Sequence, residues 1–429
     1  MGEGGTRQMS TSDHIVVVGS SLAGLRSVEA IRGAGFPGPV SLVGTEKHYP
    51  PIDRPPLSKG FLKGGDGSAL RVDEDLDLDL YLGHRAVSLD MTSRQVALDD
   101  GSVLGYQGLV VATGATERRL AGAEGKRNVH LLRSLEQAAA LRSVLTPGAR
   151  VAVIGAGVLG CEIAATCRDL HHPVTVIDVA SEPMLRILGP AIAPLLADLH
   201  REHGARLLMC RKILGLRGHD VADAVLLDND DVVEADVIVV AIGAFPETRW
   251  LETSGLELAD GVVCDSMCFA VNGGRRIVAA GDVARWDHPL LGGSIRVEHW
   301  TNAVSQGQRA GQNLVAELCG LGEPEPYEVL PYFWTDQYGW KLQFIGVLGT
   351  EATFEEGQPG DRKFVVSYRT DGRLVGVLFA NAPSRLAVWR KTITAELTTL
   401  SSGNLHPHRE EENEDRDRPG SLPGPRTVR

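Results

Sequence analysis

Two copies of one unit (a strand, a glycine turn, a helix and a second strand) constrain this chain more than any other feature. The first copy begins at His14 with HIVVVGSSLAGLRSVEAIRGAG and continues into PVSLVG; the second, RVAVIGAGVLGCEIAATCRDLHHPVTVIDV, runs from Arg150 to Val179. In both, a β-branched run precedes the glycines and helical spacing of apolar residues follows them. The copies lie about 135 residues apart, the size of a domain. Two such units predict an α/β fold with parallel sheets.

The rest of the chain extends this pattern and then departs from it. Strands that end in glycine follow the copies, with LVVATGAT beginning at Leu109, ADVIVVAIGAFP at Ala235 and RRIVAAGDVARW at Arg275. From Tyr327 the sequence changes to PYFWTDQYGWKLQFIGV and KFVVSYRTDGRLVGVLFA, followed by RLAVWRKTITAEL. These segments predict strands and then a helix, which we interpret as a small α+β domain after the linker GLGEPEPYEVL.

Composition excludes several functional classes. The 429 residues carry a net charge of −12, which argues against a nucleic-acid partner. The sequence has no apolar run near the roughly 20 residues of a membrane span and no apolar signal core, so we expect a cytoplasmic protein that does not enter membranes. Six cysteines occur without a CxxC pair, so we expect reduced thiols and no metal site.

The second glycine turn has the complete dinucleotide-binding pattern. Gly155, Gly157 and Gly160 follow a strand and open a helix, and Asp178 ends the next strand. The glycines allow a tight turn, close approach of a pyrophosphate and close packing of helix and strand, while the carboxylate accepts from a ribose hydroxyl. Asp178 would repel a 2′-phosphate, which favours NADH, although Arg186 leaves NADPH open. The expected contacts are Gly155, Gly157, Val158, Leu159, Gly160, Glu162, Asp178, Arg186 and Gly243.

The first turn is less regular. Gly19 and Gly24 take the outer positions, but Ser21 replaces the middle glycine. Its Cβ lies where a pyrophosphate should come closest, so the residue either displaces the phosphate or donates its hydroxyl to it.

A proline-rich segment after the second strand adds a resemblance. PPIDRPPLSKGFLKG begins at Pro50, and DRPPLSK, VVATGA, AAGDVAR, RVEHWTNAVSQG and FWTDQ occur in order around the two fingerprints. Together these seven motifs resemble the ferredoxin and rubredoxin reductases, a branch of the two-dinucleotide-binding flavoproteins, over about residues 12 to 400. The sequence departs from the family at Ser21, at Ile52, and at Thr45, so that the adenosine-ribose role moves to Glu46.

The resemblance implies two Rossmann-like dinucleotide-binding domains and a small C-terminal α+β domain. The first unit should hold FAD and the second NADH. The implied domains are 12–117 with 247–326 for FAD, 118–246 for NADH and 327–402 covering the flavin and the partner interface, with 1–11 and 403–429 disordered. The expected FAD contacts are Gly19, Ser21, Ala23, Gly24, Glu46, Arg54, Lys59, Val87, Thr113, Gly114, Arg133, Gly281, Asp282 and Trp300.

The same resemblance implies catalytic roles for Lys59, Glu162 and Glu298. Lys59 should lie near flavin N5 and form an ion pair with Glu162, while Glu298 lines the nicotinamide side. The residues alone also allow a solvated Lys59, a Glu162 that only favours a helix N-terminus, and a surface Glu298. His299 is expected to be a packing or capping residue.

Cysteine positions narrow the reaction. Disulfide reductases of this fold carry a cysteine pair before the Leu-Ser-Lys stretch, but no cysteine occurs between residues 1 and 160. Cys161 and Cys167 have no redox role in the resemblance. We therefore expect hydride transfer from NADH to FAD, then single electrons to a [2Fe-2S] ferredoxin serving a cytochrome P450 or a ring-hydroxylating oxygenase. The alternatives are an NADH oxidase acting on oxygen or a small acceptor, and a non-catalytic redox sensor or scaffold; the oligomeric state is open.

Overall fold

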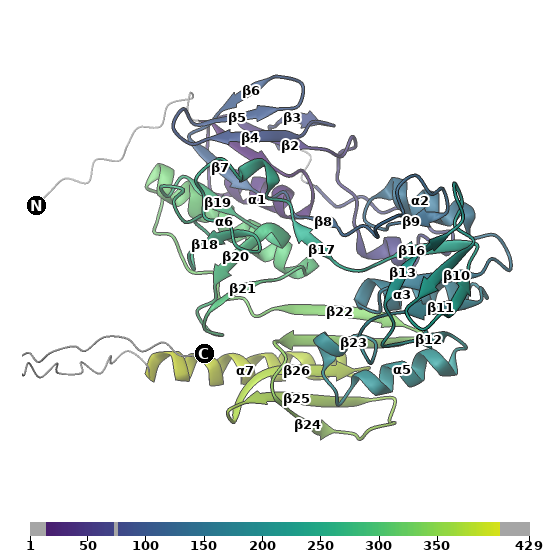
Figure 1. Cartoon of the computed structure of the whole chain (residues 1–429). Coiled ribbons are helices and arrows are strands. Elements are labelled where there is room, and N and C mark those ends of the chain that lie inside the picture. Colours follow the sequence, from purple (N-terminus) through teal and green to yellow (C-terminus); the bar gives the residue numbers. More distant parts are fainter. Residues whose placement is uncertain (1–13, 73–75, 404–429) are drawn as a thin grey trace, which may run out of the picture.

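The computed structural model describes residues 14–72 and 76–403. It confirms the predicted α/β class, with two parallel five-stranded sheets and an antiparallel C-terminal sheet (Figure 1). The ends expected to be disordered lie outside the described residues, apart from Gly403, which ends the last helix. Within the described ranges, no helix is both long and apolar enough to cross a bilayer.

The first sheet is parallel and has the order β19-β7-β1-β2-β3. Its strands are β1 (Ile15–Val18), β2 (Val40–Gly44), β3 (Asp79–Leu82), β7 (Gly108–Val111) and β19 (Ile277–Ala279). Every residue of β1, β7 and β19 is buried. This is expected for strands of a parallel sheet that is covered on both faces. Because β19 lies far along the chain, two distant segments complete this sheet.

Two helices pack closely beside the first sheet. α1 (Leu22–Gly33) contacts α6 (Trp300–Cys319) along its length. A Cβ at Gly307 would lie 2.5 Å from the Ala23 carbonyl oxygen, and one at Gly311 would lie 2.5 Å from the Ser27 carbonyl oxygen. Only glycine allows this approach, which fixes the first half of α1 against the middle of α6.

The second sheet repeats the parallel arrangement, in the order β12-β11-β10-β16-β9. Its strands are β9 (Val129–His130), β10 (Val151–Ile154), β11 (Val174–Ile177), β12 (Arg206–Leu208) and β16 (Val237–Val240). The helices of this unit are α2 (Leu135–Val144), α3 (Val158–Asp169), α4 (Leu185–Leu188) and α5 (Ala193–Glu202). The chain passes between the first and second sheets through β8 (Ala115–Glu117) and β17 (Ala244–Pro246), which pair antiparallel.

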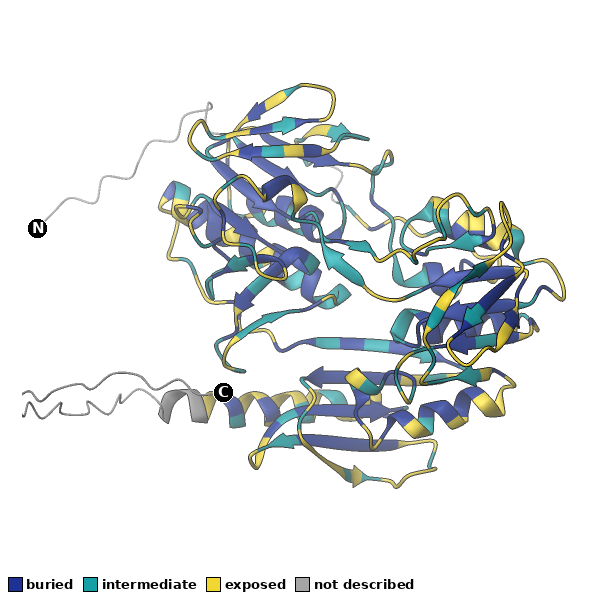
Figure 2. Cartoon of the chain, in the orientation of Figure 1, coloured by how far each residue is buried: buried dark blue, intermediate teal, exposed yellow. Residues whose placement is uncertain are grey.

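The C-terminal sheet is antiparallel and has the order β22-β23-β26-β25-β24. Its elements are β22 (Tyr332–Gln337), β23 (Trp340–Gly346), β24 (Glu351–Glu356), β25 (Phe364–Thr370), β26 (Arg373–Ala380) and the helix α7 (Leu386–Gly403). One set of its side chains shares a core with the second unit, and the other packs with α7. Figure 2 shows that the inner strands β23, β26 and β25 are mostly buried, whereas the edge strand β24 is largely exposed. The Tyr368 hydroxyl also donates to the Leu188 carbonyl oxygen at 2.7 Å.

Short elements complete the fold. Three small sheets contain β4 (Ala86–Asp90), β5 (Gln95–Leu98) and β6 (Val103–Gly105); β13 (Ile213–Arg217), β14 (Ala224–Leu227) and β15 (Val232–Glu234); and β18 (Val262–Cys264), β20 (Ala284–Asp287) and β21 (Ser294–Arg296). The 3-10 turns are η1 (Pro55–Ser58), η2 (Arg249–Leu251), η3 (Gly281–Val283) and η4 (Pro383–Arg385).

A buried histidine at the interface of the second unit with the C-terminal sheet makes stability depend on pH. Burial lowers the pKa of His200 from 6.5 to about 4. The unfolded chain takes up this proton near pH 6.5 whereas the folded chain does not, so stability is complete above that pH and falls toward pH 4. A shift of this size is worth about 3 kcal/mol. Urea unfolding at neutral pH and at about pH 4.5 should show the loss.

The matched variant for this prediction is His200→Gln, which has no group that titrates in the range. Its loss of stability on acidification should be smaller than that of the parent protein by most of the His200 contribution. Equal losses in the two proteins would show that His200 is not the group responsible.

Candidate active site

The two glycine turns have the same construction. Gly19 and Gly155 have φ values of +117° and +104°. A Cβ would lie 2.0 Å from the Ala112 carbonyl oxygen at the first and 2.2 Å from the Ala241 carbonyl oxygen at the second. In each turn the neighbouring strand therefore lies against the backbone of the first glycine, and no side chain fits there.

The third glycine of each turn meets the first. A Cβ on Gly24 would lie 1.8 Å from the Gly19 carbonyl oxygen, and one on Gly160 would lie 1.9 Å from the Gly155 carbonyl oxygen. α1 and α3 can therefore begin directly on their turns, with their free N–H groups directed outward.

Ser21 stands at the middle position without strain. Its φ and ψ are −86° and −161°, and those of Gly157 at the corresponding place are −75° and −172°. Both are extended conformations that any residue adopts. A Cβ on Gly157 would meet no protein atom within 4 Å. Protein packing therefore does not require glycine at this position, and the remaining reason for it is the approach of a ligand.

Both turns open onto one cavity of about 590 Å³. The cavity is lined by predicted FAD contacts, by predicted NADH contacts and by the predicted nicotinamide-side residue Glu298. The FAD contacts are Ser21, Ala23, Arg54, Lys59, Gly114, Arg133, Asp282 and Trp300, and the NADH contacts are Gly157, Val158, Leu159, Glu162 and Gly243. The structure thus brings residues from two separate turns to a single space, at a size typical of cofactor sites.

The other predicted residues lie outside the lining. Gly19, Gly24, Gly155 and Gly160 form the turns, and a Cβ on Gly281 would lie 2.9 Å from the Ala23 Cβ. Thr113 donates its hydroxyl to the Glu247 carbonyl oxygen. Arg186 is exposed on α4, and Val87 is 47% exposed on β4. Their roles toward a ligand stay predictions.

Two predicted carboxylates outside the lining have protein partners. Glu46 Oε1 accepts from Arg54 Nη2 at 2.9 Å. The two Asp178 oxygens accept from the backbone N–H groups of Ala156 at 2.6 Å and Ala180 at 2.7 Å. These bonds fix the Asp178 carboxylate at the end of β11, next to the second turn.

The predicted ion pair between Lys59 and Glu162 is present. Lys59 Nζ lies 2.7 Å from Glu162 Oε2, and it also donates to the Pro55 carbonyl oxygen at 3.2 Å. The lysine follows η1, and the glutamate lies on α3 behind the second turn. The pair therefore joins the two halves of the cavity.

Glu162 is only 5% exposed and has further donors. Ser58 Oγ donates to Oε2 at 2.7 Å and Thr335 Oγ1 donates to Oε1 at 2.8 Å. A buried carboxylate needs such compensation. Sequence reasoning did not single out either hydroxyl, although both belong to quoted motifs, Leu-Ser-Lys and FWTDQ.

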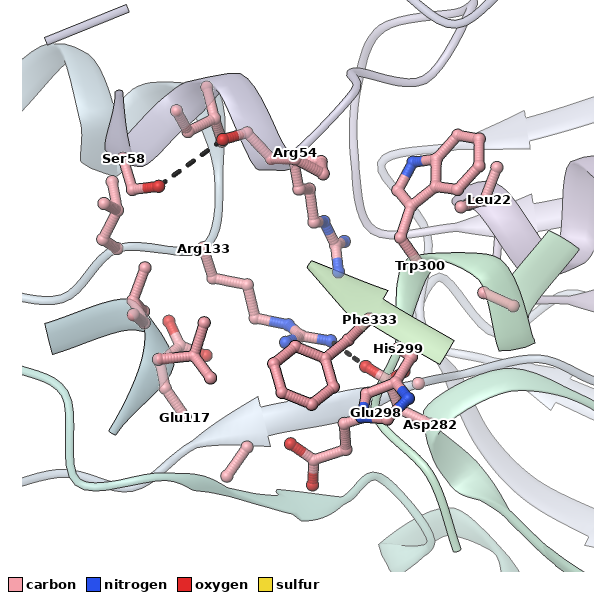
Figure 3. Close-up of a pocket in the computed structure, with 18 of the residues that line it drawn as sticks. Leu22, Arg54, Ser58, Glu117, Arg133, Asp282, Glu298, His299, Trp300 and Phe333 are labelled. Atoms are coloured by element: carbon pink, nitrogen blue, oxygen red, sulfur yellow. Dashed lines mark hydrogen bonds and ion pairs between the residues drawn. The ribbon is translucent and has the colours of Figure 1, made fainter. Parts of the chain in front are cut away.

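The opposite wall of the cavity is rich in charge. Arg133 Nη2 lies 3.1 Å from Asp282 Oδ2, and Figure 3 shows Arg54 and Arg133 extending into the same space. Burial and the nearby Arg133 guanidinium lower the pKa of Arg54 from its usual value. Two guanidinium groups suit an anionic ligand such as a pyrophosphate. Glu298 is paired with Arg296 at 2.7 Å and faces the cavity.

Aromatic side chains close one end of the cavity. The ring centroids of His299 and Phe333 lie 5.1 Å apart. The His299 side chain makes no capping hydrogen bond to α6. Of the two roles expected for His299, packing and capping, the structure shows packing. Burial lowers the pKa of His299 to about 4. Trp300 Nε1 donates to Asp53 Oδ1 at 2.8 Å, and its ring lies 6.0 Å from Trp334 at a steep angle.

The cysteines of α3 do not reach this space. Cys161 and Cys167 are buried, and desolvation raises the pKa of each thiol, that of Cys167 to about 12. Thiols in such surroundings are inert as nucleophiles. None of the described residues that line the cavity is a cysteine.

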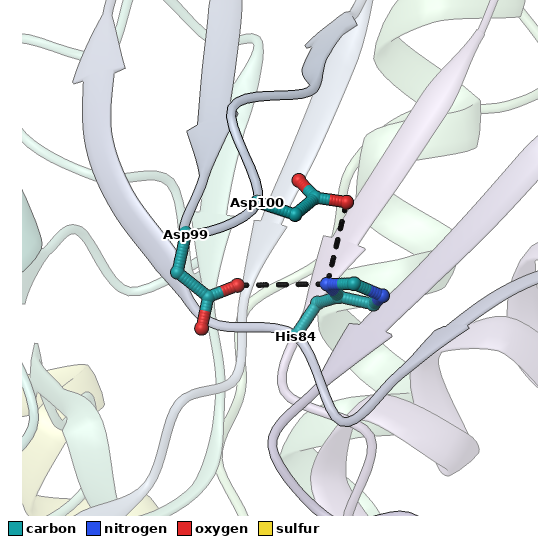
Figure 4. Close-up of side chains that lie close together, drawn as sticks. All are labelled: His84, Asp99 and Asp100. Carbon is teal, nitrogen blue, oxygen red and sulfur yellow. Dashed lines mark ion pairs between the residues drawn. The ribbon is translucent and has the colours of Figure 1, made fainter.

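One further cluster of ionisable groups lies away from the cavity. His84 Nδ1 is 3.5 Å from both Asp99 Oδ1 and Asp100 Oδ2 (Figure 4). The carboxylates also accept from the backbone of Arg85 and Ser102, and the Ser102 bonds lower the pKa of Asp100. These bonds show that the group stabilises the turn between β5 and β6.

This chain is similar to known proteins over most of its length. Residues 13–307 match the family described as pyridine nucleotide-disulphide oxidoreductase, and residues 332–405 match the reductase C-terminal family. The ferredoxin–NAD(+) reductase component of the anthranilate 1,2-dioxygenase system of Burkholderia cepacia is 34% identical, over 90% of this chain and 95% of its own. The corresponding component of the p-cumate 2,3-dioxygenase system of Pseudomonas putida is 35% identical, over 88% and 92%.

A solved structure is also similar over most of the chain. The crystal structure of a covalent putidaredoxin reductase–putidaredoxin complex matches with a TM-score of 0.84 and 29% identity. The match covers 90% of this chain and 94% of that one. It includes the C-terminal sheet as well as both parallel sheets.

Proposed function

Because the chain belongs to the pyridine nucleotide-disulphide oxidoreductase family, among its ferredoxin–NAD(+) reductases, we propose that it passes electrons from NADH through bound FAD to a [2Fe-2S] ferredoxin. One observation carries the proposal. Two dinucleotide-type turns open onto one cavity, and the Lys59–Glu162 pair joins its two halves.

The first turn and the charged wall suit FAD. The N–H groups at the start of α1 and the Arg54 and Arg133 guanidiniums would hold the pyrophosphate, since all of them favour negative charge. Ser21 would place its hydroxyl at the phosphate, and Asp282 would accept from the ribityl hydroxyls. When bound, FAD accepts a hydride and can release its electrons singly.

The second turn suits NADH. The start of α3 would meet the pyrophosphate, and the fixed Asp178 carboxylate would accept from the adenosine ribose. A 2′-phosphate would bring negative charge toward this carboxylate, so we expect NADH to bind more tightly than NADPH despite the nearby Arg186. Lys59 would place positive charge where the two rings meet, which favours an anionic reduced ring.

The acceptor is proposed from two observations. The residues lining the cavity offer no thiol, so the electrons need another exit than a disulfide. The relatives are reductase components of dioxygenase systems, and one solved relative is joined to its ferredoxin, putidaredoxin. We propose that the ferredoxin of this chain serves a ring-hydroxylating dioxygenase or a cytochrome P450.

Cytochrome c reduction with a panel of [2Fe-2S] ferredoxins tests the acceptor. The FAD-loaded protein is mixed with NADH or NADPH, and cytochrome c reduction and oxygen consumption are followed with and without each ferredoxin. At least one ferredoxin should raise the cytochrome c signal, with NADH much better than NADPH. Oxygen consumption that exceeds cytochrome reduction with every ferredoxin would favour an NADH oxidase and contradict the proposal.

A further inference from the structure

A chain of hydrogen-bonded side chains leads away from the Lys59–Glu162 pair into the interface with the C-terminal sheet. Thr335 Oγ1 lies 2.8 Å from Glu162 Oε1, and Gln337 Nε2 lies 3.1 Å from Thr335 Oγ1. Beyond them, His200 Nε2 lies 3.0 Å from Gln337 Oε1. Two units of the fold contribute, because Glu162 and His200 belong to α3 and α5 while Thr335 and Gln337 belong to β22.

The orientation of the Gln337 amide fixes the direction in which the donors of this row of hydrogen bonds point. The amide nitrogen faces the Thr335 hydroxyl, so its oxygen faces His200, and the ring must donate from Nε2. The other ring nitrogen then accepts from the Tyr338 hydroxyl at 3.1 Å. Every donor in the chain thus points toward Glu162.

Because these side chains are buried, the loss of any one of these hydrogen bonds costs free energy. His200 and Thr335 are fully buried, and Gln337 is 2% exposed. An unpartnered polar group at such a place costs about 1–3 kcal/mol. Apolar side chains would fill this interface without that risk, and such replacements often stabilise a protein. A role in the site accounts for these polar residues where packing alone does not.

We propose that His200 and Gln337 are positioning residues that hold Glu162 on Lys59 through the Thr335 hydroxyl. The hydroxyl has one proton, and it goes to Glu162 only while the Gln337 amide donates into the same oxygen. The His200 N–H holds that amide in place. Without it, the amide can turn its oxygen toward Thr335 and draw the proton away from Glu162. The inference rests on the proposed function, since it concerns the same pair.

Three variants test the role of these hydrogen bonds against a matched control. His200→Leu removes the N–H, whereas His200→Gln keeps an N–H donor at a similar reach. The control is His172→Leu, because His172 is also buried in this unit but bonds to the Ala149 carbonyl oxygen at 3.2 Å. The third variant, Thr335→Val, removes the donor to Glu162 itself.

The readouts are the rate of FAD reduction at saturating NADH, the KM for NADH, the flavin reduction potential and the melting temperature. We expect both leucine variants to melt earlier. His200→Leu and Thr335→Val alone should slow FAD reduction, by roughly five- to tenfold, the effect of losing one buried hydrogen bond. Both should also lower the flavin potential with little change in KM, and His200→Gln should restore both values.

Equal rates and potentials in His200→Leu and His172→Leu would overturn the proposal, and so would a failure of His200→Gln to restore them. If His200→Leu does not fold, Thr335→Val decides by the same two readouts. A parent protein that binds FAD but is not reduced by NADH would refute the proposed function separately. The potential, measured with a chemical reductant, would still test the positioning role.

Discussion

A Gly24→Ala protein should be purified without FAD, whereas a Gly160→Ala protein should stay yellow and fail to bind NADH. A Cβ at either place would lie within 2 Å of a backbone carbonyl oxygen, 1.8 Å at Gly24 and 1.9 Å at Gly160. Relief requires α1 or α3 to move away from its turn, which costs about 1–3 kcal/mol and displaces the N–H groups from the pyrophosphate. We expect an affinity loss of about 100-fold for one cofactor in each variant.

Flavin content after purification and titration with NADH measure the two effects. Gly33→Ala is the matched control, because Gly33 also lies in α1 and a Cβ there meets nothing within 4 Å. It should keep both cofactors. If Gly24→Ala keeps FAD while Gly160→Ala loses it, the two turns have been assigned in the wrong order.

Replacing Lys59 with Met should give the second large effect. The change removes the positive charge from the meeting point of the two ligands, and we expect FAD reduction by NADH to slow by about 100- to 1,000-fold. It also leaves the Glu162 carboxylate buried without its cation, which costs about 3–5 kcal/mol. Stopped-flow reduction and urea unfolding measure these two results.

Lys63→Met is the control for Lys59→Met. Lys63 Nζ pairs with Asp169 Oδ2 at 2.6 Å, so it also links the segment after η1 to α3. Unlike the Lys59–Glu162 pair, these two side chains are 43% and 40% exposed. A surface pair of this kind is worth about 0–1 kcal/mol. The control should therefore reduce FAD at the parent rate. A similar slowing of FAD reduction in both variants would mean that loss of either lysine slows the reaction. The contact between Lys59 and Glu162 would then not be the cause.

The sequence was sufficient to predict the parts of the site that depend on local pattern. Gly19 and Gly155 were identified because a strand, a turn and a helix leave a signature within one short segment. The Lys59–Glu162 pair is not a local pattern; it follows from the resemblance to the ferredoxin reductases, and the structure contains it. Ser21 was noted as a departure, and the backbone angles show why the turn tolerates it.

Other parts could not be predicted because their signals are not local. Thr335 meets Glu162 across 173 positions, and His200 meets Gln337 across 137. Nothing in the helical pattern of α5 separates His200 from an ordinary buried residue. The three small sheets, two antiparallel and one mixed, were also missed, since strands of three to five residues carry little periodicity.

Anaerobic mixing of the FAD-loaded protein with NADH, after alkylation of its accessible thiols, tests the central claim most directly. The account predicts that one NADH bleaches the visible absorbance of one bound FAD, because the two ligands meet at Lys59 and Glu162 with no thiol between them. A protein that stays colourless after incubation with FAD would contradict the account. So would a bound flavin that dithionite bleaches and NADH does not.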